Sequence, residues 1–325
     1  MSATTTNARQ GGKLSAGNLI GRIPTLGVYG VLILMFILAS IFVPGFTKPQ
    51  NLTNVLQHSV VLGLVAIGQT FVILAASLDL SVGVMISLIG VATSLLISGR
   101  VSMILPAVIV ALLLGILLGL INGLIITKLR VNSFIATLGM MLVLEGALFS
   151  RFDNFAGRVP RQFEFLGYKT VGPVPVGVLL MLAVAALAWL ILRFTKFGHH
   201  VYGIGGNAEV SRLSGVRTDR IMIGAHILAG LGAAISALFL VSRLRTAAPW
   251  IGKGLELDSI AAVVVGGAPL SGGRGSVWGT IGGVLILSIL NNVFNLLAVD
   301  AFLQDVMRGA IVILVVAFYS ARLRK

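Results

Sequence analysis

The sequence of 325 residues contains no cysteine and few charged residues. Without a thiol the chain forms no disulfide, no thiolate metal site and no cysteine nucleophile. Charged residues make up only 10% of the chain, whereas soluble domains carry roughly 25%. Apolar residues make up 57%, and the mean hydropathy is +1.04. These values exclude an ordinary water-soluble domain and indicate an integral membrane protein.

Signatures of metal-dependent catalysis and of ATP binding are also missing from the sequence. No Gly-x-x-x-x-Gly-Lys-Ser/Thr motif is present, so we expect no ATP, and no other cofactor, to be bound by this chain itself. The acids expected inside the membrane are Asp79 and Glu145, with Asp258 near a helix start, which is few for a proton relay. The four histidines form no metal-binding spacing such as His-Glu-x-x-His: His58, His199, His200 and His226.

The net charge of +14 comes from 24 Lys and Arg against 10 Asp and Glu. A nucleic-acid-binding domain would carry its basic residues on a soluble face, whereas here they stand between long apolar runs. We therefore expect the lipid bilayer, and no nucleic acid, as the anionic partner.

Apolar runs long enough to cross a bilayer recur along the chain. A helix needs roughly 17 to 25 mostly apolar residues to span the hydrocarbon core. The eighth run is short and rich in glycine, which is typical of a broken or re-entrant helix that lines a cavity. We predict an all-α integral membrane protein, a bundle of about ten transmembrane helices, near residues 26–44, 52–76, 81–98, 103–126, 131–150, 174–193, 221–242, 257–270, 277–297 and 304–320.

An even number of spans places both termini on one side of the membrane. Lys and Arg are more frequent in the loops on that side, which predicts that both termini are cytoplasmic. The expected organisation is a cytoplasmic tail over 1–25, a transmembrane domain over 26–320 and a cytoplasmic tail over 321–325, with a long cytoplasmic loop at 194–220.

Small residues recur at helix-packing intervals in two of these spans. Gly115, Gly119 and Gly123 form a double Gly-x-x-x-Gly pattern, and Gly279 and Gly283 form a further one. Such glycines more often allow two helices to approach closely than bind a ligand. They predict a compact bundle.

The loop at 194–220 contains the signals of a short helix. Asn207 is a good N-cap, Ala208 to Ser214 can form two turns, and Gly215 can end them in the left-handed conformation. Glu209 and Arg212 then share one face at spacing i, i+3, and Val210 and Leu213 share a neighbouring face. The sequence leaves two interpretations open, a solvated surface helix or a docking element for a cytoplasmic partner.

Four stretches of the chain resemble one known family. The segment "GGNAEVSRLSGV" strongly resembles the coupling segment in permease subunits of ABC importers for ribose and related monosaccharides. The stretches "LDLSVG", "FIATLGMM" and "ELDSIAAVVVGGAPLSGGRGSVWGT" are also similar to that family and follow in its order. One departure is "AASLDLSVG", where the family often has glycine just before the core of the motif, which puts the local backbone shape in doubt.

The resemblance implies roles for two groups of residues. Contact with an ATPase is implied for Asn207, Ala208, Glu209, Val210, Arg212, Leu213 and Gly215. A motif or gating role is implied for Asp79, Ser81, Gly83, Gly272, Gly273 and Gly275.

The resemblance also implies a mechanism and a set of partners. The chain is expected to pair with a second permease copy, as a homodimer, and with two cytoplasmic ABC ATPases that hold Mg-ATP. An extracytoplasmic sugar-binding protein is expected to deliver a pentose or a hexose. Transport would follow alternating access across a bacterial inner membrane. The alternatives are an ion-coupled secondary carrier for a small polar solute, which works alone, and an intramembrane enzyme.

Polar residues inside the spans are candidates for the substrate pathway. Asn291 and Asn295 share one face of the ninth span, and Gln69 and Asn122 lie deep in other spans. Asparagines in membranes also join helices, and we favour that structural role for the pair on the ninth span. Asn54, Gln57 and His58 begin the second span and are expected to meet interfacial water.

Asp79 is the acid that most needs an explanation. It precedes the third span, where its carboxylate can accept backbone N–H groups at the positive helix end, as Glu256 and Asp258 can at the eighth span. An asparagine would cap equally well, and a charge at membrane depth costs about 2.5 to 3.5 kcal/mol. We therefore predict that Asp79, with Gly83 as a flexible point, also holds the second and third spans in one of two arrangements through a charged partner.

Overall fold

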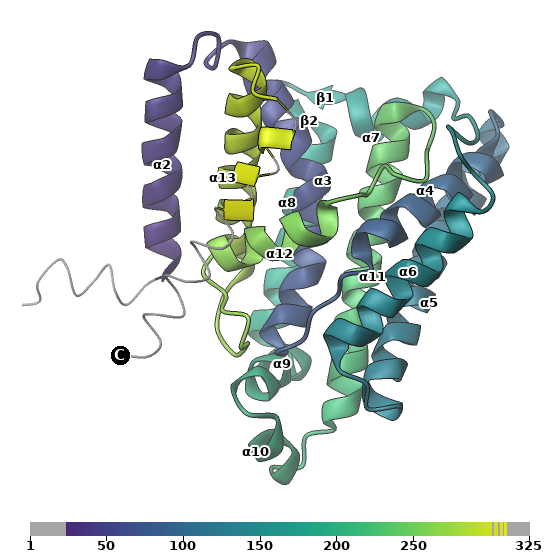
Figure 1. Ribbon diagram of the computed structural model, residues 1–325, viewed down its shortest axis with the longest axis vertical. Helices are drawn as coiled ribbons and strands as arrows, with labels where there is room; N and C mark the ends of the chain where they lie inside the picture. Colours follow the sequence, from purple (N-terminus) through teal and green to yellow (C-terminus); the bar gives the residue numbers. More distant parts are fainter. Residues whose placement is uncertain (1–23, 301, 305, 308, 311–325) are drawn as a thin grey trace, which may run out of the picture.

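The computed structural model describes residues 24–300, 302–304, 306–307 and 309–310. The predicted tails, apart from Pro24 and Thr25, and most of the predicted span at 304–320 lie outside the described residues. Within them the chain is mainly helical (Figure 1). The longer helices are α2 (Pro24–Phe42), α3 (Pro49–Leu74), α4 (Val82–Ile97), α5 (Ile104–Lys128), α6 (Ser133–Phe149), α8 (Val176–Phe194), α11 (Thr218–Leu244), α12 (Leu255–Val265) and α13 (Val277–Leu296).

Short elements fill the connections between these helices. A two-residue antiparallel pair, in which Thr170 faces Pro175, departs from the all-α prediction but is confined to the connection before α8. The short elements are η1 (Val101–Met103), η2 (Arg161–Glu164), α7 (Phe165–Tyr168), β1 (Thr170–Val171), β2 (Val174–Pro175), α9 (Lys196–Gly206) and α10 (Ala208–Leu213).

The lengths of the helices support the prediction of an integral membrane protein. Among the described residues, five helices are long and apolar enough to cross a membrane, and three shorter ones are also apolar. The first nine predicted ranges each contain a helix, but α12 has only 11 residues. At 1.5 Å per residue it is about half as long as the roughly 30 Å hydrocarbon core. The eighth element is therefore a short helix, as expected, while the total of ten spans stays a prediction.

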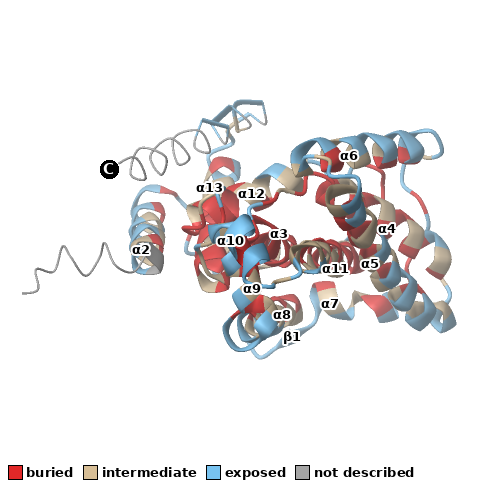
Figure 2. Cartoon of the chain, turned by 90° about the horizontal axis from the view of Figure 1, so that it is seen from below, coloured by how far each residue is buried: buried red, intermediate tan, exposed pale blue. Residues whose placement is uncertain are grey.

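The helices form a bundle around α3 and α11. Helix α11 packs against α5, α3 and α4, and α13 packs against α3, α12 and α2 (Figure 1). Buried residues concentrate at the centre of the bundle, whereas the outer helices carry many exposed residues (Figure 2). Large apolar side chains are exposed on these outer helices, as Ile41 on α2, Leu105 on α5 and Leu142 on α6 illustrate. An apolar outer surface of this kind suits lipid.

The predicted glycine contacts are confirmed. A Cβ on Gly119 would clash with the backbone carbonyl of His226, and one on Gly115 would clash with that of Gly230. On α13, Gly279 and Gly283 lie equally close to the backbone of α12 and the turn that follows it. Each opposing atom is backbone, so no side chain can move aside to make room. These glycines set how closely the helices approach.

We expect Gly119→Val to destabilise the bundle by about 1 to 3 kcal/mol, because α5 and α11 must separate to admit the new side chain. The matched control is Gly146→Val on α6, where nothing lies within 4 Å of an added Cβ. Unfolding of both variants in detergent with increasing denaturant measures the difference. Equal stability of the two variants would contradict this packing role.

Helix α9 is an element that local sequence signals did not predict. Its 11 residues include Gly198, Gly203, Gly205 and Gly206, and each glycine disfavours a helix by about 1 kcal/mol. The structure uses some of them for contact: Gly198 lies against the backbone of Leu192, and Gly205 lies against the ends of other segments. Tertiary packing therefore overrides the weak local propensity.

Candidate functional site

Helix α10 is the exposed tip at one end of the bundle (Figure 1). As predicted, Asn207 caps it: the backbone N–H of Val210 donates to Asn207 Oδ1 at 3.0 Å. Gly215 follows the helix with φ of +84°, also as predicted. Arg212 donates two hydrogen bonds to the Glu209 carboxylate, and this pairing lowers the pKa of Glu209. The local conformation is thus determined by local contacts.

The apolar face of α10 contacts little of the described chain. Val210 is 57% exposed and Leu213 is 76% exposed. The ion pair alone would stabilise a solvated helix, and two neighbouring apolar side chains exposed to water add nothing to that stability. Their exposure favours the docking interpretation.

A glycine-rich loop packs between α9 and the end of α3. Gly272, Gly273 and Gly275 all have positive φ values, of +79°, +71° and +135°. The N–H of Gly273 donates to the carbonyl of Leu74 at the end of α3, at 2.9 Å, and Tyr202 Oη of α9 donates to the carbonyl of Gly275 at 3.0 Å.

Cβ atoms would not fit in this loop. One on Gly272 would lie 2.6 Å from the backbone N of Ala76, and one on Gly273 would lie 2.8 Å from that of Gly206. The loop is therefore wedged between the end of α3 and the end of α9, one residue before the cap of α10.

Asp79 lies shortly after that end of α3, in a fully buried polar cluster. Ser81 donates to Asp79 Oδ1 through its backbone N–H at 3.0 Å and its hydroxyl at 2.6 Å. Asn122 Nδ2 of α5 donates to Asp79 Oδ2 at 3.2 Å and to Ser81 Oγ at 2.9 Å. Gln69 Nε2 of α3 donates to the Asp79 carbonyl at 3.2 Å. The cluster joins α3, α4 and α5.

The titratable partner of Asp79 is His226 of α11. His226 Nδ1 lies 3.1 Å from Asp79 Oδ2, and its Nε2 lies 3.0 Å from Ser77 Oγ. An ionised Asp79 carboxylate only accepts hydrogen bonds, so in that state of the pair Nδ1 is the nitrogen that carries a proton and donates it. Asp79 is not itself the N-cap residue of α4, because that residue is Ser81, whose backbone N–H Asp79 accepts. A role of Asp79 beyond the start of this helix stays a prediction.

Gly83 lies in the first turn of α4, against the segment before α12. A Cβ there would clash with the Glu256 carboxylate and lie 2.7 Å from the carbonyl of Gly252. Glu256 Oε1 accepts the backbone N–H of Gly254, the N-cap residue of α12. Glu256 therefore accepts a backbone N–H at the start of this helix, as predicted. The structure therefore supplies a packing reason for Gly83, and its role as a flexible point stays a prediction.

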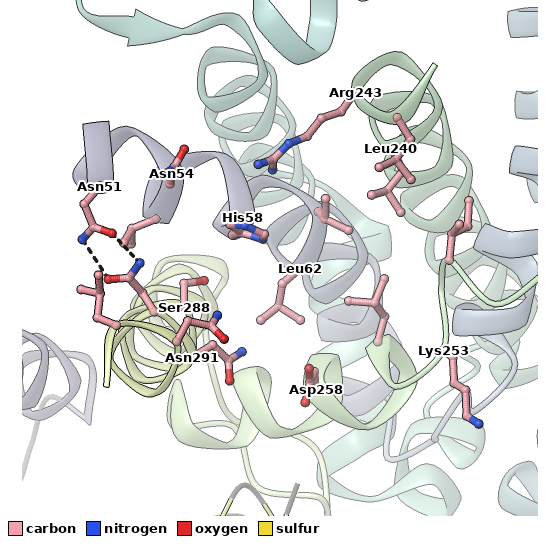
Figure 3. A pocket seen from close by; sticks show the side chains of 18 residues that line it. Asn51, Asn54, His58, Leu62, Leu240, Arg243, Lys253, Asp258, Ser288 and Asn291 are labelled. Atoms are coloured by element: carbon pink, nitrogen blue, oxygen red, sulfur yellow. Dashed lines mark hydrogen bonds between the residues drawn. The ribbon is translucent and has the colours of Figure 1, made fainter. Parts of the chain in front are cut away.

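A polar cavity of about 620 Å³ opens between α3, α11, α12 and α13 (Figure 3). It is bordered by the start of α3 and the ends of α11 and α13, so it lies toward the end of the bundle opposite α10. Its polar lining comprises Asn51, Asn54, His58, Arg243, Lys253, Asp258, Ser288, Asn291, Asn292 and Asn295.

Two of these asparagines join helices. Asn51 and Asn292 donate to each other's side-chain oxygens at 2.9 and 2.8 Å and tie the start of α3 to α13 (Figure 3).

Comparison with known proteins identifies the chain. Residues 51–316 match the family described as the branched-chain amino acid transport system / permease component. The chain belongs to this permease family.

Three named relatives cover most of the permease. It is 40% identical over 305 residues to the ribose import permease protein of Bacillus subtilis, with 91% of this chain and 92% of that protein covered. It is 38% identical over 290 residues to the ribose import permease protein of Escherichia coli, covering 88% and 90%. It is 37% identical over 294 residues to the L-arabinose transport system permease protein of Escherichia coli, covering 89% of each. No solved structure matches the chain.

The resemblance seen in the sequence is therefore confirmed, and the permease is a multi-pass transport subunit of an ABC importer family. The predicted pathway residues of this permease fall into two places. Asn291 and Asn295 line the polar cavity, whereas Gln69 and Asn122 are buried in the Asp79 cluster and do not line it. The structure does not bring the four together, and a pathway role for the buried pair stays a prediction.

Sequence reasoning missed two residues of this permease. Arg243 lies just beyond the predicted span at 221–242 and was not a candidate, yet it belongs to the last turn of α11 and lines the cavity. His226 was tested only as a metal ligand, although a lone histidine in an apolar span is a natural partner for a membrane-buried acid. A search for pairs of titratable residues at membrane depth would have found His226.

Proposed function

We propose that this chain is the membrane-spanning subunit of an ATP-driven importer that carries a monosaccharide, a ribose-like pentose or a hexose, by alternating access. The observation that carries the proposal is the 37 to 40% identity, over about nine-tenths of both chains, to permeases named for ribose and L-arabinose. The exposed apolar face of α10 and the polar cavity at the opposite end support it, since a transported solute and an energy-supplying partner need separate sites.

The expected assembly places two copies of this chain in an inner membrane with both termini in the cytoplasm. ABC ATPases, which hold Mg-ATP, dock on α10, and an extracytoplasmic sugar-binding protein docks at the other end. In this orientation the polar cavity faces the extracytoplasmic side.

The path for coupling follows contacts between named segments. A displacement of α10 reaches α9 through Asn207, because this residue joins the two helices. From α9 it reaches the glycine loop through Tyr202, and from the loop it reaches the end of α3 through Gly273. The Asp79 cluster begins just beyond and binds α4, α5 and α11. Movement at α10 would thereby change the packing of the helices around the pathway.

Uptake measurements test the proposal directly. A strain lacking this chain is expected to lose uptake of one labelled pentose or hexose in a panel, and the restored gene is expected to return it. L-Leucine belongs in the panel, because the family description names branched-chain amino acids. Leucine uptake without sugar uptake would contradict the proposal. So would solute accumulation driven by an ion gradient in vesicles that contain this chain alone, because it would establish a secondary carrier.

A further inference from the structure

We propose that the polar cavity is an acceptor site for the monosaccharide within this permease, and that Arg243 is its principal hydrogen-bond donor. The inference rests on the proposed function and names the site at which the released sugar is first held. Its volume of about 620 Å³ falls within the roughly 300 to 1,000 Å³ typical of small-molecule sites.

Arg243 places a cationic hydrogen-bond donor on the wall of the cavity. Its guanidinium extends from α11 over the cavity toward His58 (Figure 3). The residue is partly buried, and within the described part of the chain its guanidinium makes no hydrogen bond and no ion pair. A guanidinium has five N–H donors and no acceptor, and those of Arg243 are open to the cavity rather than sealed inside the bundle. An oxygen-rich ligand in the cavity would satisfy them.

The neighbouring arginine shows the contrast. Arg245, two residues later, donates to Glu164 at 2.8 Å and does not line the cavity. The same stretch of chain therefore holds one arginine with a carboxylate partner and one directed into an open polar space. A purely structural role for Arg243 would predict a partner like that of Arg245.

The other polar groups suit hydroxyls. Asn54 and His58 approach from α3, Asn291 from α13 and Asp258 from α12, while Lys253 points away (Figure 3). Amide and imidazole groups both donate and accept hydrogen bonds, as each sugar hydroxyl does. The side chains of Leu62 and Leu240 add apolar surface for the C–H face of a sugar ring. The arrangement spans four helices, so movement of these helices relative to one another would dismantle the site and release the sugar.

The absence of cysteine makes a direct test possible, because any introduced thiol is unique in this chain. Leu240→Cys places it on the cavity wall, and Ser102→Cys places it on an exposed connection outside the cavity. Both are introduced into the complete transporter in whole cells and treated with a membrane-impermeant thiol reagent. D-ribose, L-arabinose, D-glucose, D-galactose and L-leucine are added in turn, and uptake of each is measured in the same cells.

We expect the transported sugar, at about ten times its dissociation constant, to slow labelling of Leu240→Cys by about tenfold, because an occupied cavity excludes the reagent. Labelling of Ser102→Cys should not change. Adding Arg243→Gln to Leu240→Cys should remove the protection without changing the unprotected labelling rate. Arg245→Gln, the matched variant outside the cavity, should keep the protection.

Each of the remaining outcomes contradicts the acceptor site, the proposed function or the role of Arg243. A sugar that is taken up but does not slow labelling would overturn the acceptor site and leave the proposed function standing. Protection by leucine, with no uptake of or protection by any sugar, would overturn both. Protection that persists in Arg243→Gln, with Arg243→Lys behaving alike, would overturn the role of Arg243.

Discussion

Leu213→Asp on α10 is expected to reduce uptake to about 1% of the wild-type rate or less, a loss equivalent to about 2.7 kcal/mol. Leu213 is 76% exposed and lies beside Val210, and a buried apolar anchor at a protein interface contributes about 2 kcal/mol or more. A carboxylate in its place would have to enter an apolar groove of the ATPase unpaired. The bundle should remain folded, because no core residue changes.

Uptake by a control variant, uptake by a charge-exchange variant and binding of the ATPase together separate a docking role of α10 from an effect on the stability of this helix. Leu129→Asp, at an equally exposed leucine after α5, is the matched control and should retain most of the uptake. Exchanging the two charged residues, as Glu209→Arg with Arg212→Glu, keeps an i, i+3 pair on the helix but reverses the charges offered to a partner. This exchange should also uncouple transport. Wild-type uptake in both Leu213→Asp and the exchange variant would remove α10 from the mechanism, and normal uptake with weaker ATPase binding would reduce it to an attachment point.

Asp79→Asn is expected to slow uptake at least about tenfold, a barrier change near 1.4 kcal/mol, in a protein that still assembles with its ATPase. Asparagine has nearly the same size and can still accept from Ser81. However, the cluster already aims donors from Ser81, Asn122 and His226 at this carboxylate, and an asparagine has only one acceptor oxygen. The contact with α11 is the one we expect to change.

Asp79→Ala should also lose stability, by about 3 to 5 kcal/mol, because it leaves several buried donors without an acceptor. A double-mutant cycle between Asp79→Asn and His226→Phe, with uptake and unfolding measured for each protein, tests whether the two residues act as a pair. Additive effects would rule out coupling between them. Normal import by Asp79→Asn, together with misfolding of Asp79→Ala, would leave the residue as part of a helix start and exclude a gating role.

Much of this architecture is local in origin and could be predicted. The apolar runs match the helices α2 to α6, α8, α11 and α13 to within a few residues. The reason is that a long apolar segment in a bilayer must satisfy its backbone N–H and C=O groups within the segment, which a helix does. Helix α10 was predictable for the same reason: Asn207, the Glu209–Arg212 pair and Gly215 each act within a few residues. Helix α9 was not, since its glycines oppose helix formation and contacts from outside the segment compensate.

The sequence by itself determined the class of molecule, the positions of most of its long apolar helices, the short helix α10 and the presence of an acid inside the bundle. Only the tertiary structure decided the partner of that acid, because His226 lies 147 residues from Asp79 and no local pattern links them. The same holds for the cavity, whose lining comes from α3, α11, α12 and α13, and for Arg243, which differs from Arg245 only in what surrounds it. Helix packing selects these pairings through close backbone contacts at residues such as Gly119, and the energy of such contacts depends on both partners at once.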